Sequence, residues 1–183
     1  MNTIVKEKKK LTYQDYMKTP DDKRYELING ELIEMPAPFI IHQRILRKLG
    51  FRLDHFINNN KLGEIFIAPC DVVFDDENVH QPDLLFISKE RSQIIDEKNV
   101  KGAPDIAIEI VSKSSAYTDF VVKKGLNEKF GVKEYWIVVP EEKTIEIYLL
   151  QDNKYNLFKQ FNVEETLESP SLKGFKLTLK EVF

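Results

Sequence analysis

The sequence contains few of the residues that build sulfur- or histidine-based sites. Cys70 is the only cysteine among 183 residues, which excludes an intramolecular disulfide and a zinc cluster of thiolates. The three histidines, His42, His55 and His80, are scattered along the sequence, which argues against a zinc site of several histidines. The single cysteine fits a reducing compartment, and we expect a cytoplasmic protein.

Long hydrophobic runs are also absent. The longest apolar stretches have the length of β-strands, whereas a transmembrane helix needs about 20 apolar residues. Residues 1–10 are rich in lysine and lack the apolar segment of a secretory signal, so we predict a disordered tail there. Residues 11–183 have the length of a single domain with its own core, and no membrane partner is expected.

An excess of positive charge is absent as well. The formal net charge is −3, which argues against indiscriminate attraction of nucleic acid but leaves room for a local basic groove. Asp and Glu together number 30, and a site for divalent cations itself adds acidic residues. The composition therefore keeps open a hard-cation site built from oxygen ligands.

The pattern along the chain predicts an α/β fold with a mixed sheet. Asn29-Gly30 between two alternating runs predicts a β-hairpin over 25–35, because both turn positions need positive φ. One crossover helix joins two buried strands, so we expect the strands of Glu109 and Trp136 to be parallel neighbours. The other predicted elements are a short helix over 11–17, a helix over 40–58, strands over 64–69, 71–74, 83–87, 107–111 and 134–139, a polar segment with some helical character over 89–99, a helix from Ser114 or Ser115 to Phe130, and a C-terminal hairpin of strands over 144–150 and 155–161.

The predicted helix over 40–58 has an apolar face and a basic face. Apolar residues recur at three- to four-residue spacing, with basic residues opposite them. The apolar face comprises Ile41, Ile45, Leu49, Leu53 and Phe56, and the basic face comprises Arg44, Arg47, Lys48 and Arg52. The basic face suits contacts with phosphates, although such a face is more often only solvated.

Two carboxylates stand in strand-like apolar runs. Asp83 follows Pro82 at the head of the run 83–87, and Glu109 lies inside the run 104–112. Because an unpaired buried carboxylate is costly, Glu109 needs a metal ion, a lysine or an exposed sheet edge to compensate it. The alternatives are that Glu109 lies on a solvated face and that Asp83 caps a turn.

Lys123 lies on the inward face of the helix that follows Glu109. At about 100° per residue, the inward stripe comprises Ala116, Phe120, Lys123, Leu126 and Phe130, whereas Lys124 is rotated away. A lysine in the centre of such a face either snorkels its ammonium into water or finds a carboxylate partner. We expect the ammonium to point into the same pocket as Asp83 and Glu109.

These features together resemble the PD-(D/E)XK, or restriction-endonuclease-like, superfamily, and above all its Uma-type branch of restriction endonucleases. The resemblance covers most of the chain and is carried by the order and spacing of several short blocks. They are YELINGEL (25–32), His42-Gln43, QPDLLF (81–86), APD (103–105) leading to EIVS (109–112), Asp119 with Lys123, and FGVKEYWIV (130–138). The resemblance implies a restriction-endonuclease-like core, in which a mixed central sheet is flanked by helices, with N-terminal and C-terminal β-hairpins.

The sequence departs from the superfamily pattern at several positions. Val111 stands where the superfamily motif places its lysine, but the Uma-type branch carries that lysine on the following helix, where Lys123 matches it. Lys113 and Asn127 also differ from the residues common in relatives, and these differences look peripheral.

Two further positions in the pattern are less constrained. The superfamily's additional acidic residue has no match within 40–58, and Glu26 in the first hairpin is the substitute that we assign. His42 either contacts substrate or supports the structure, and we favour the structural role.

The resemblance implies metal-dependent hydrolysis of nucleic-acid, above all DNA, phosphodiester bonds. Asp83 and Glu109 would hold Mg²⁺ or Mn²⁺ with the backbone carbonyl of Ile110 as a further ligand. Lys123 would position or help to deprotonate the attacking water and screen the transition state. The expected catalytic set is Asp83, Glu109, Lys123 and Glu26.

Two other functions are compatible with the sequence. A catalytically inactive module that binds nucleic acid or a protein partner is favoured by Val111 and by the acidic net charge. The other alternative is hydrolysis of a phosphate ester that is not part of a nucleic acid. We also expect a homodimer, because such enzymes often cut two strands with paired subunits, and either hairpin offers an edge for pairing.

Overall fold

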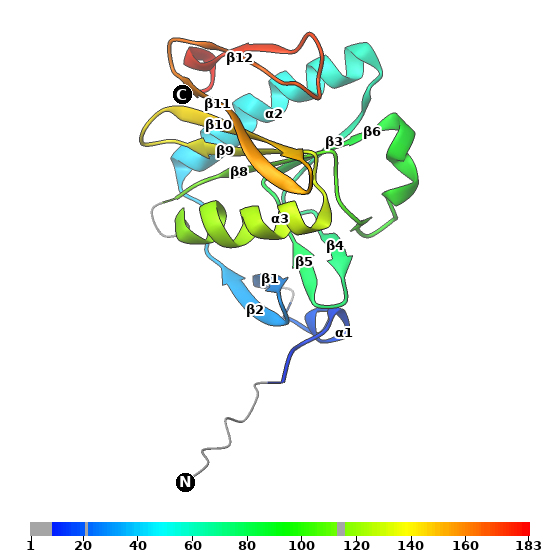
Figure 1. Ribbon diagram of the computed structural model, residues 1–183. Coiled ribbons are helices and arrows are strands. Elements are labelled where there is room, and N and C mark those ends of the chain that lie inside the picture. Colours follow the sequence, from blue (N-terminus) through cyan, green and yellow to red (C-terminus); the bar gives the residue numbers. More distant parts are fainter. Residues whose placement is uncertain (1–8, 21, 113–115) are drawn as a thin grey trace.

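A six-stranded mixed sheet lies at the centre of the protein (Figure 1). The computed structural model describes residues 9–20, 22–112 and 116–183. The strand order of the central sheet is β11-β10-β9-β8-β6-β3. Its strands are β3 (Gly63–Ile67), β6 (Leu84–Ser88), β8 (Ile106–Ile110), β9 (Glu134–Val139), β10 (Thr144–Gln151) and β11 (Lys154–Asn162). Strands β8 and β9 pair in parallel, as predicted, and the other neighbours are antiparallel.

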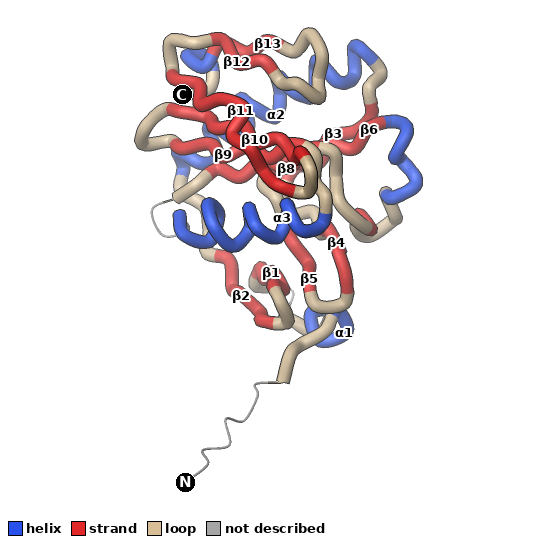
Figure 2. The backbone as a smooth tube through the Cα atoms, viewed as in Figure 1, coloured by secondary structure: helices blue, strands red, loops and turns tan. Residues whose placement is uncertain are grey.

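A second sheet of five short strands lies beside the central one (Figure 2), in the order β2-β1-β5-β4-β7. Its strands are β1 (Arg24–Ile28), β2 (Glu31–Met35), β4 (Val72–Asp75), β5 (Asn78–His80) and β7 (Val100–Lys101). The predicted first hairpin forms β1 and β2, and its turn residues Asn29 and Gly30 have φ values of 52° and 79°. The short helix α1 (Tyr13–Tyr16) lies within the range 11–17 predicted for it and buries Tyr16 against this sheet.

Helices cover both faces of the central sheet. Helix α2 (Ile40–Asn60) packs on the face of β8 that carries Ile106, Ile108 and Ile110. The opposite face is covered by the π-helical turn η2 (Thr118–Lys123), helix α3 (Lys124–Phe130) and part of the second sheet. Because side chains alternate along β8, Glu109 points to this second face, between the two sheets and η2.

Helix α2 is longer than predicted and its inward face is shifted. Ile45, Leu49 and Leu53 are buried as expected, but Leu46 and Ile57 complete the face. The predicted inward residues Ile41 and Phe56 are exposed and partly buried, respectively. Since Phe39 and Ile40 are exposed too, the first turn of α2 extends beyond the core.

The basic face of α2 is partly used within the protein. Lys48 donates to the backbone carbonyl of Phe183 at 3.1 Å, and Arg52 pairs with Glu181 at 2.7 Å. Arg44 and Arg47 are exposed. Half of this face therefore anchors the C-terminal segment.

The sequence pattern did not predict the C-terminal segment. It forms the hairpin of β12 (Thr166–Glu168) and β13 (Lys176–Thr178) and the 3₁₀ turn η3 (Leu179–Glu181), while the polar segment after β6 contains the 3₁₀ turn η1 (Lys89–Ile94). Strands of three residues are too short to show an alternating pattern. Apolar residues of the whole C-terminal segment join the core under α2, namely Leu167, Leu172, Phe175, Leu177, Leu179 and Val182.

Some predictions fall on residues outside the described ranges. These are most of the expected tail, over 1–8, the helix cap at Ser114 or Ser115, and Lys113. Within the described part of that tail, Lys10 pairs with Glu77 at 2.6 Å. In the described ranges, no helix has both the length and the apolar content needed to cross a bilayer.

Gly63 is expected to be indispensable for the pairing of β3 with β6. Its φ is 149°, and an added Cβ would lie 2.1 Å from the carbonyl oxygen of Ile87. We expect Gly63→Ala to lower the free energy of unfolding by about 2 kcal/mol or more, measured by urea denaturation. Gly125→Ala in α3 is the control, because an added Cβ there meets no atom within 4 Å. It should raise stability by about 0.5–1 kcal/mol, and equal effects of the two variants would contradict the argument.

Candidate active site

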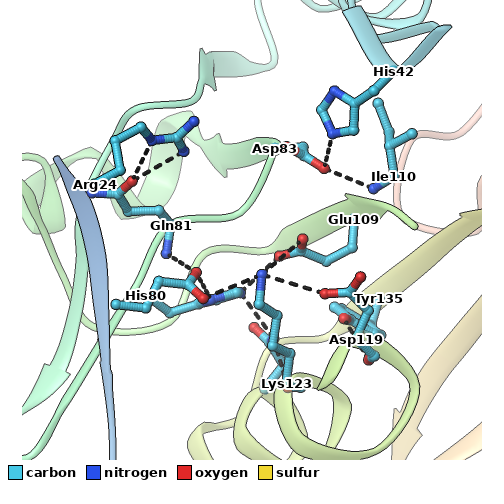
Figure 3. A network of polar contacts seen from close by, with 12 residues as sticks. Arg24, His42, His80, Gln81, Asp83, Glu109, Ile110, Asp119, Lys123 and Tyr135 are labelled. Atoms are coloured by element: carbon cyan, nitrogen blue, oxygen red, sulfur yellow. Dashed lines mark hydrogen bonds and ion pairs between the residues drawn. The ribbon is translucent and has the colours of Figure 1, made fainter. Parts of the chain in front are cut away.

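Asp83 lies where the pairing of β6 with β8 ends. The last residue pair of the ladder is Leu84 with Ile108. Beyond it, the Asp83 side chain takes the place of the missing strand, since its Oδ2 accepts the N–H of Ile110 at 2.8 Å. The same oxygen lies 2.9 Å from Nε2 of His42 in the first turn of α2. Two groups on different elements thus fix the orientation of the Asp83 carboxylate (Figure 3).

Glu109 is buried beside Lys123. Their exposed fractions are 3% and 2%, and Lys123 Nζ lies 3.2 Å from Glu109 Oε2. The same Nζ lies 3.4 Å from Oδ1 of Asp119, one turn earlier in η2. These contacts exclude a solvated Glu109 and a snorkelling Lys123, and they give the lysine the carboxylate partner that the sequence predicted.

The second sheet contributes a further acid and an imidazole. Glu26 on β1 and His80 on β5 are fully buried, and His80 Nδ1 lies 2.9 Å from Glu26 Oε1. The other ring nitrogen, Nε2, lies 3.1 Å from Glu109 Oε1. Glu26 Oε2 is also 3.3 Å from Lys123 Nζ. His80 and Lys123 therefore each bridge Glu26 and Glu109, and they tie the two sheets to η2.

The charges of this buried cluster shift one another's pKa values. Burial opposes the charged form of His80, but Glu26 and Glu109 outweigh it and raise the pKa of His80 to about 9. Burial likewise opposes the charge of Lys123, yet its carboxylate partners, led by Glu109, raise its pKa well above the ordinary value. Burial also opposes ionisation of Glu26, whose pKa Lys123 and His80 nevertheless lower.

Glu109 is the least compensated acid of the cluster. Burial raises its pKa to about 7 against the opposing effects of Lys123 and His80, and the nearby Asp83 adds repulsion. Its Oε1 is buried and, among the described residues, has no hydrogen-bond partner of good geometry although His80 is close. An additional positive charge beside Glu109 would favour its ionised form.

Asp119 and Lys123 belong to a π-helical turn rather than to the regular α-helix that the sequence predicted. Such turns occur frequently at functional sites. Lys124 still lies away from the cluster, with Nζ 3.5 Å above the ring of Tyr148, as the periodicity indicated. Asn127 is fully buried and donates to the backbone carbonyl of Lys123 at 2.9 Å, so this position is not peripheral, as the sequence had suggested.

One cavity contains the two acids that were expected to bind metal. Its lining includes Asp83 and Glu109, together with His42, Gln43, Ile110, Ser112, Asp119 and Arg24. The expectation that the Lys123 ammonium points into the same pocket is wrong: among the described residues, Lys123 does not line this cavity but contacts Glu109 from the interior of the protein. The two carboxylates therefore share one hollow, and the amine supports one of them from behind.

The oxygen donors of the cavity suit a hard divalent cation. Mg²⁺ uses one or two protein carboxylates and keeps several waters, so Asp83 and Glu109 are sufficient. Oε1 of Glu109 is buried and receives no hydrogen bond of good geometry from the nearby His80, so it can serve as an oxygen ligand. Within the described ranges, no three or more His, Cys, Asp or Glu side chains are grouped as metal ligands. An ion here would thus rely on two carboxylates and a backbone carbonyl such as that of Ile110.

The site combines residues that the sequence predicted with others that only the fold brings together. The structure places all four expected side chains, Asp83, Glu109, Lys123 and Glu26, in or directly behind the cavity wall. His42, which we expected to be only structural, contacts Asp83, and His80 was not singled out by the sequence. Asp119 has a local signal, because it precedes Lys123 by four residues on a helix.

Lys123 is expected to be essential for the stability of the cluster. Lys123→Met leaves buried carboxylates without their cation, and we expect it to lower the free energy of unfolding by about 3–5 kcal/mol. Lys124→Met is the matched control and should cost less than about 1 kcal/mol, because it removes only a cation–π contact at a half-buried position. Urea denaturation at neutral pH compares the two, and similar losses would show that the ion pairs of Lys123 do not hold the cluster together.

Comparisons with known proteins agree with this architecture. Residues 12–180 match the family described as "Uma2: Putative restriction endonuclease". A crystal structure of a putative nuclease belonging to DUF820 from Anabaena variabilis ATCC 29413 superposes with a TM-score of 0.78 at 21% sequence identity, covering 94% of this chain and 97% of that chain. The search of curated proteins gave no match. The solved structure shows the same fold, and the family match extends over nearly the whole sequence. The chain is therefore a member of the Uma2 family, within the restriction-endonuclease-like fold class that its sequence motifs indicated.

Proposed function

We propose that the protein is a metal-dependent nuclease that hydrolyses phosphodiester bonds, with DNA as its substrate. The observation that carries this proposal is the shared cavity of Asp83 and Glu109, two carboxylates from neighbouring strands with a buried ammonium behind one of them. The Uma2 family, described as "Putative restriction endonuclease", and the fold shared with the putative nuclease from Anabaena variabilis support the same class of reaction.

Asp83 and Glu109 are the proposed ligands of Mg²⁺ or Mn²⁺, with the Ile110 carbonyl as a third oxygen donor. Such an ion, when bound, lowers the pKa of a coordinated water and offsets the charge that develops on the phosphate. His42 and the Ile110 N–H hold the Asp83 carboxylate, and Lys123 and His80 hold the Glu109 carboxylate. Ligands fixed in this way need little reorganisation when a cation or a substrate arrives.

Lys123 and Glu26 are proposed to act through Glu109 rather than on the substrate directly. Lys123 does not line the described cavity, and Glu26 is fully buried beneath it. Lys123 favours the ionised form of Glu109, and Glu26 helps to keep Lys123 and His80 charged. In this proposal both residues support the site, whereas the resemblance had implied that Lys123 positions or helps to deprotonate the attacking water.

We further propose that two copies of the chain act together. Strands β2 and β11, which belong to the two hairpins predicted from the sequence, are the outer strands of their sheets. An unpaired strand edge is a ready surface for association with a second chain. A dimer would present two cavities to the two strands of a duplex.

Asp83→Asn and Glu109→Gln should each reduce cleavage about a hundredfold or more, because each removes a charged group from the reacting centre. The assay follows hydrolysis of double- and single-stranded DNA with Mg²⁺ or Mn²⁺, and EDTA should abolish it. Asp105→Asn is the matched control, since Asp105, like Asp83, directly precedes a strand and accepts a backbone N–H, that of Ser88, at 2.8 Å. It is not among the described residues that line the cavity, so its cleavage rate should stay near that of the wild type under conditions where all variants are folded.

Calorimetric titration with Mn²⁺ separates the nuclease from an inactive module of the same fold. The nuclease proposal requires binding that Glu109→Gln weakens strongly and Asp105→Asn leaves in place. If Asp83→Asn cleaves DNA at the wild-type rate, the site assignment is overturned. The absence of any carboxylate-dependent binding would favour the inactive module.

A further inference from the structure

Arg24 is the one permanently charged cation among the described residues that line the cavity. It stands at the start of β1 and lines the cavity together with Gln81 and the acids Asp83, Glu109 and Asp119. A phosphodiester entering this cavity meets carboxylates on most sides. The position of a guanidinium there therefore matters for any anionic ligand.

Arg24 has no carboxylate partner within the described ranges, in contrast to Arg52 and Arg91, which pair with Glu181 and Asp105. Its Nε and Nη2 instead donate to the side-chain oxygen of Gln81, at 3.3 and 3.1 Å (Figure 3). A neutral amide orients the guanidinium without neutralising it. The positive charge and the remaining N–H groups stay available to a ligand.

The orientation of Gln81 is itself fixed by its neighbours. Its Nε2 donates to Asp71 Oδ1 at 2.7 Å and to the hydroxyl of Tyr16 at 3.1 Å, and Tyr16 donates to the same Asp71 oxygen at 2.8 Å. Because an ionised carboxylate only accepts hydrogen bonds, the amide NH₂ must face Asp71 and the amide oxygen must face Arg24. This buried arrangement holds the guanidinium at the cavity before any ligand binds.

We propose that Arg24 is a phosphate-binding residue that takes a phosphate group of the substrate backbone at the side of the cavity next to Asp83 and Glu109. A guanidinium presents parallel N–H groups that match two oxygens of one phosphate, which an ammonium does not. The inference rests on the proposed function for its substrate, but phosphate binding by Arg24 is testable without any cleavage.

The first experiment uses inorganic phosphate and the ¹⁵N–¹H side-chain signal of Arg24 Nε, which is identified by its loss in Arg24→Gln. Phosphate should shift this signal saturably in the wild type. Arg24→Gln should bind phosphate about tenfold more weakly or worse, and Arg24→Lys should be intermediate. Arg52→Gln is the control, because it makes the same charge change at a paired position outside the cavity, and it should bind as the wild type does.

The second experiment measures the KM of DNA cleavage at several salt concentrations. Arg24→Gln should raise KM about tenfold with a smaller effect on kcat and should reduce the slope of log KM against log salt by about 1, whereas Arg52→Gln should leave both unchanged. A residue that only supports Gln81 would not change the salt dependence.

The outcomes separate this inference from the proposed function. If phosphate shifts the Arg24 signal but the wild type cleaves no nucleic acid, the anion site stands and the nuclease assignment fails. If DNA is cleaved but phosphate leaves the signal in place, or Arg24→Gln binds phosphate as tightly as the wild type, the inference is overturned. Arg24→Lys also lacks the Nε–H group and identifies the signal independently, so the wild-type signal decides this even if Arg24→Gln does not fold.

Discussion

Three carboxylates from three different elements are buried around one ammonium and one imidazolium, and the relative placement of the two sheets depends on them. At about 3.3 Å and an effective dielectric constant of about 20, each ion pair is worth about 5 kcal/mol, which is similar to the several kcal/mol needed to desolvate each ion. The cluster therefore adds little net stability when complete. If Glu26 on β1, Glu109 on β8 or Lys123 on η2 is removed, a buried charge is left without its partner. These three elements can therefore pack together in essentially one way.

The two acids of the cavity are fixed by different physical means. Asp83 is oriented by hydrogen bonds, because it accepts the N–H that Ile110 cannot give to a neighbouring strand. Glu109 is held by charges, and burial outweighs these charges so that its pKa is raised to about 7. The fold thus leaves one carboxylate incompletely compensated beside another that is rigidly held. The divalent cation that we propose for this cavity would supply the charge that the protein itself does not provide.

The sequence predicted those parts of the fold and the site that depend on local pattern. Alternation in 104–112 placed Glu109 on its face, and helical periodicity selected Lys123 over Lys124, although the turn is π-helical. His80 escaped prediction because β5 has only three residues and joins Glu26 through a contact between positions 54 residues apart. For His42 we favoured a supporting role, but its partner Asp83 was not predicted, because the contact joins positions 41 residues apart. Histidines scattered in sequence therefore gave no local sign that two of them converge on neighbouring carboxylates.

The acidic character of the cavity sets a condition on any nucleic-acid substrate. A backbone phosphate must approach Asp83, Glu109 and Asp119 on a chain whose formal net charge is −3, so global attraction cannot bring it there. On the basic face of α2, Lys48 and Arg52 are engaged with the C-terminal segment, which leaves Arg44 and Arg47 exposed. Attraction next to the acids themselves would come from the proposed cation and from Arg24. Because Gln81 holds Arg24 without a counter-charge, the protein keeps one positive group in place among its acids, and recognition of the phosphate becomes local rather than a property of the whole surface.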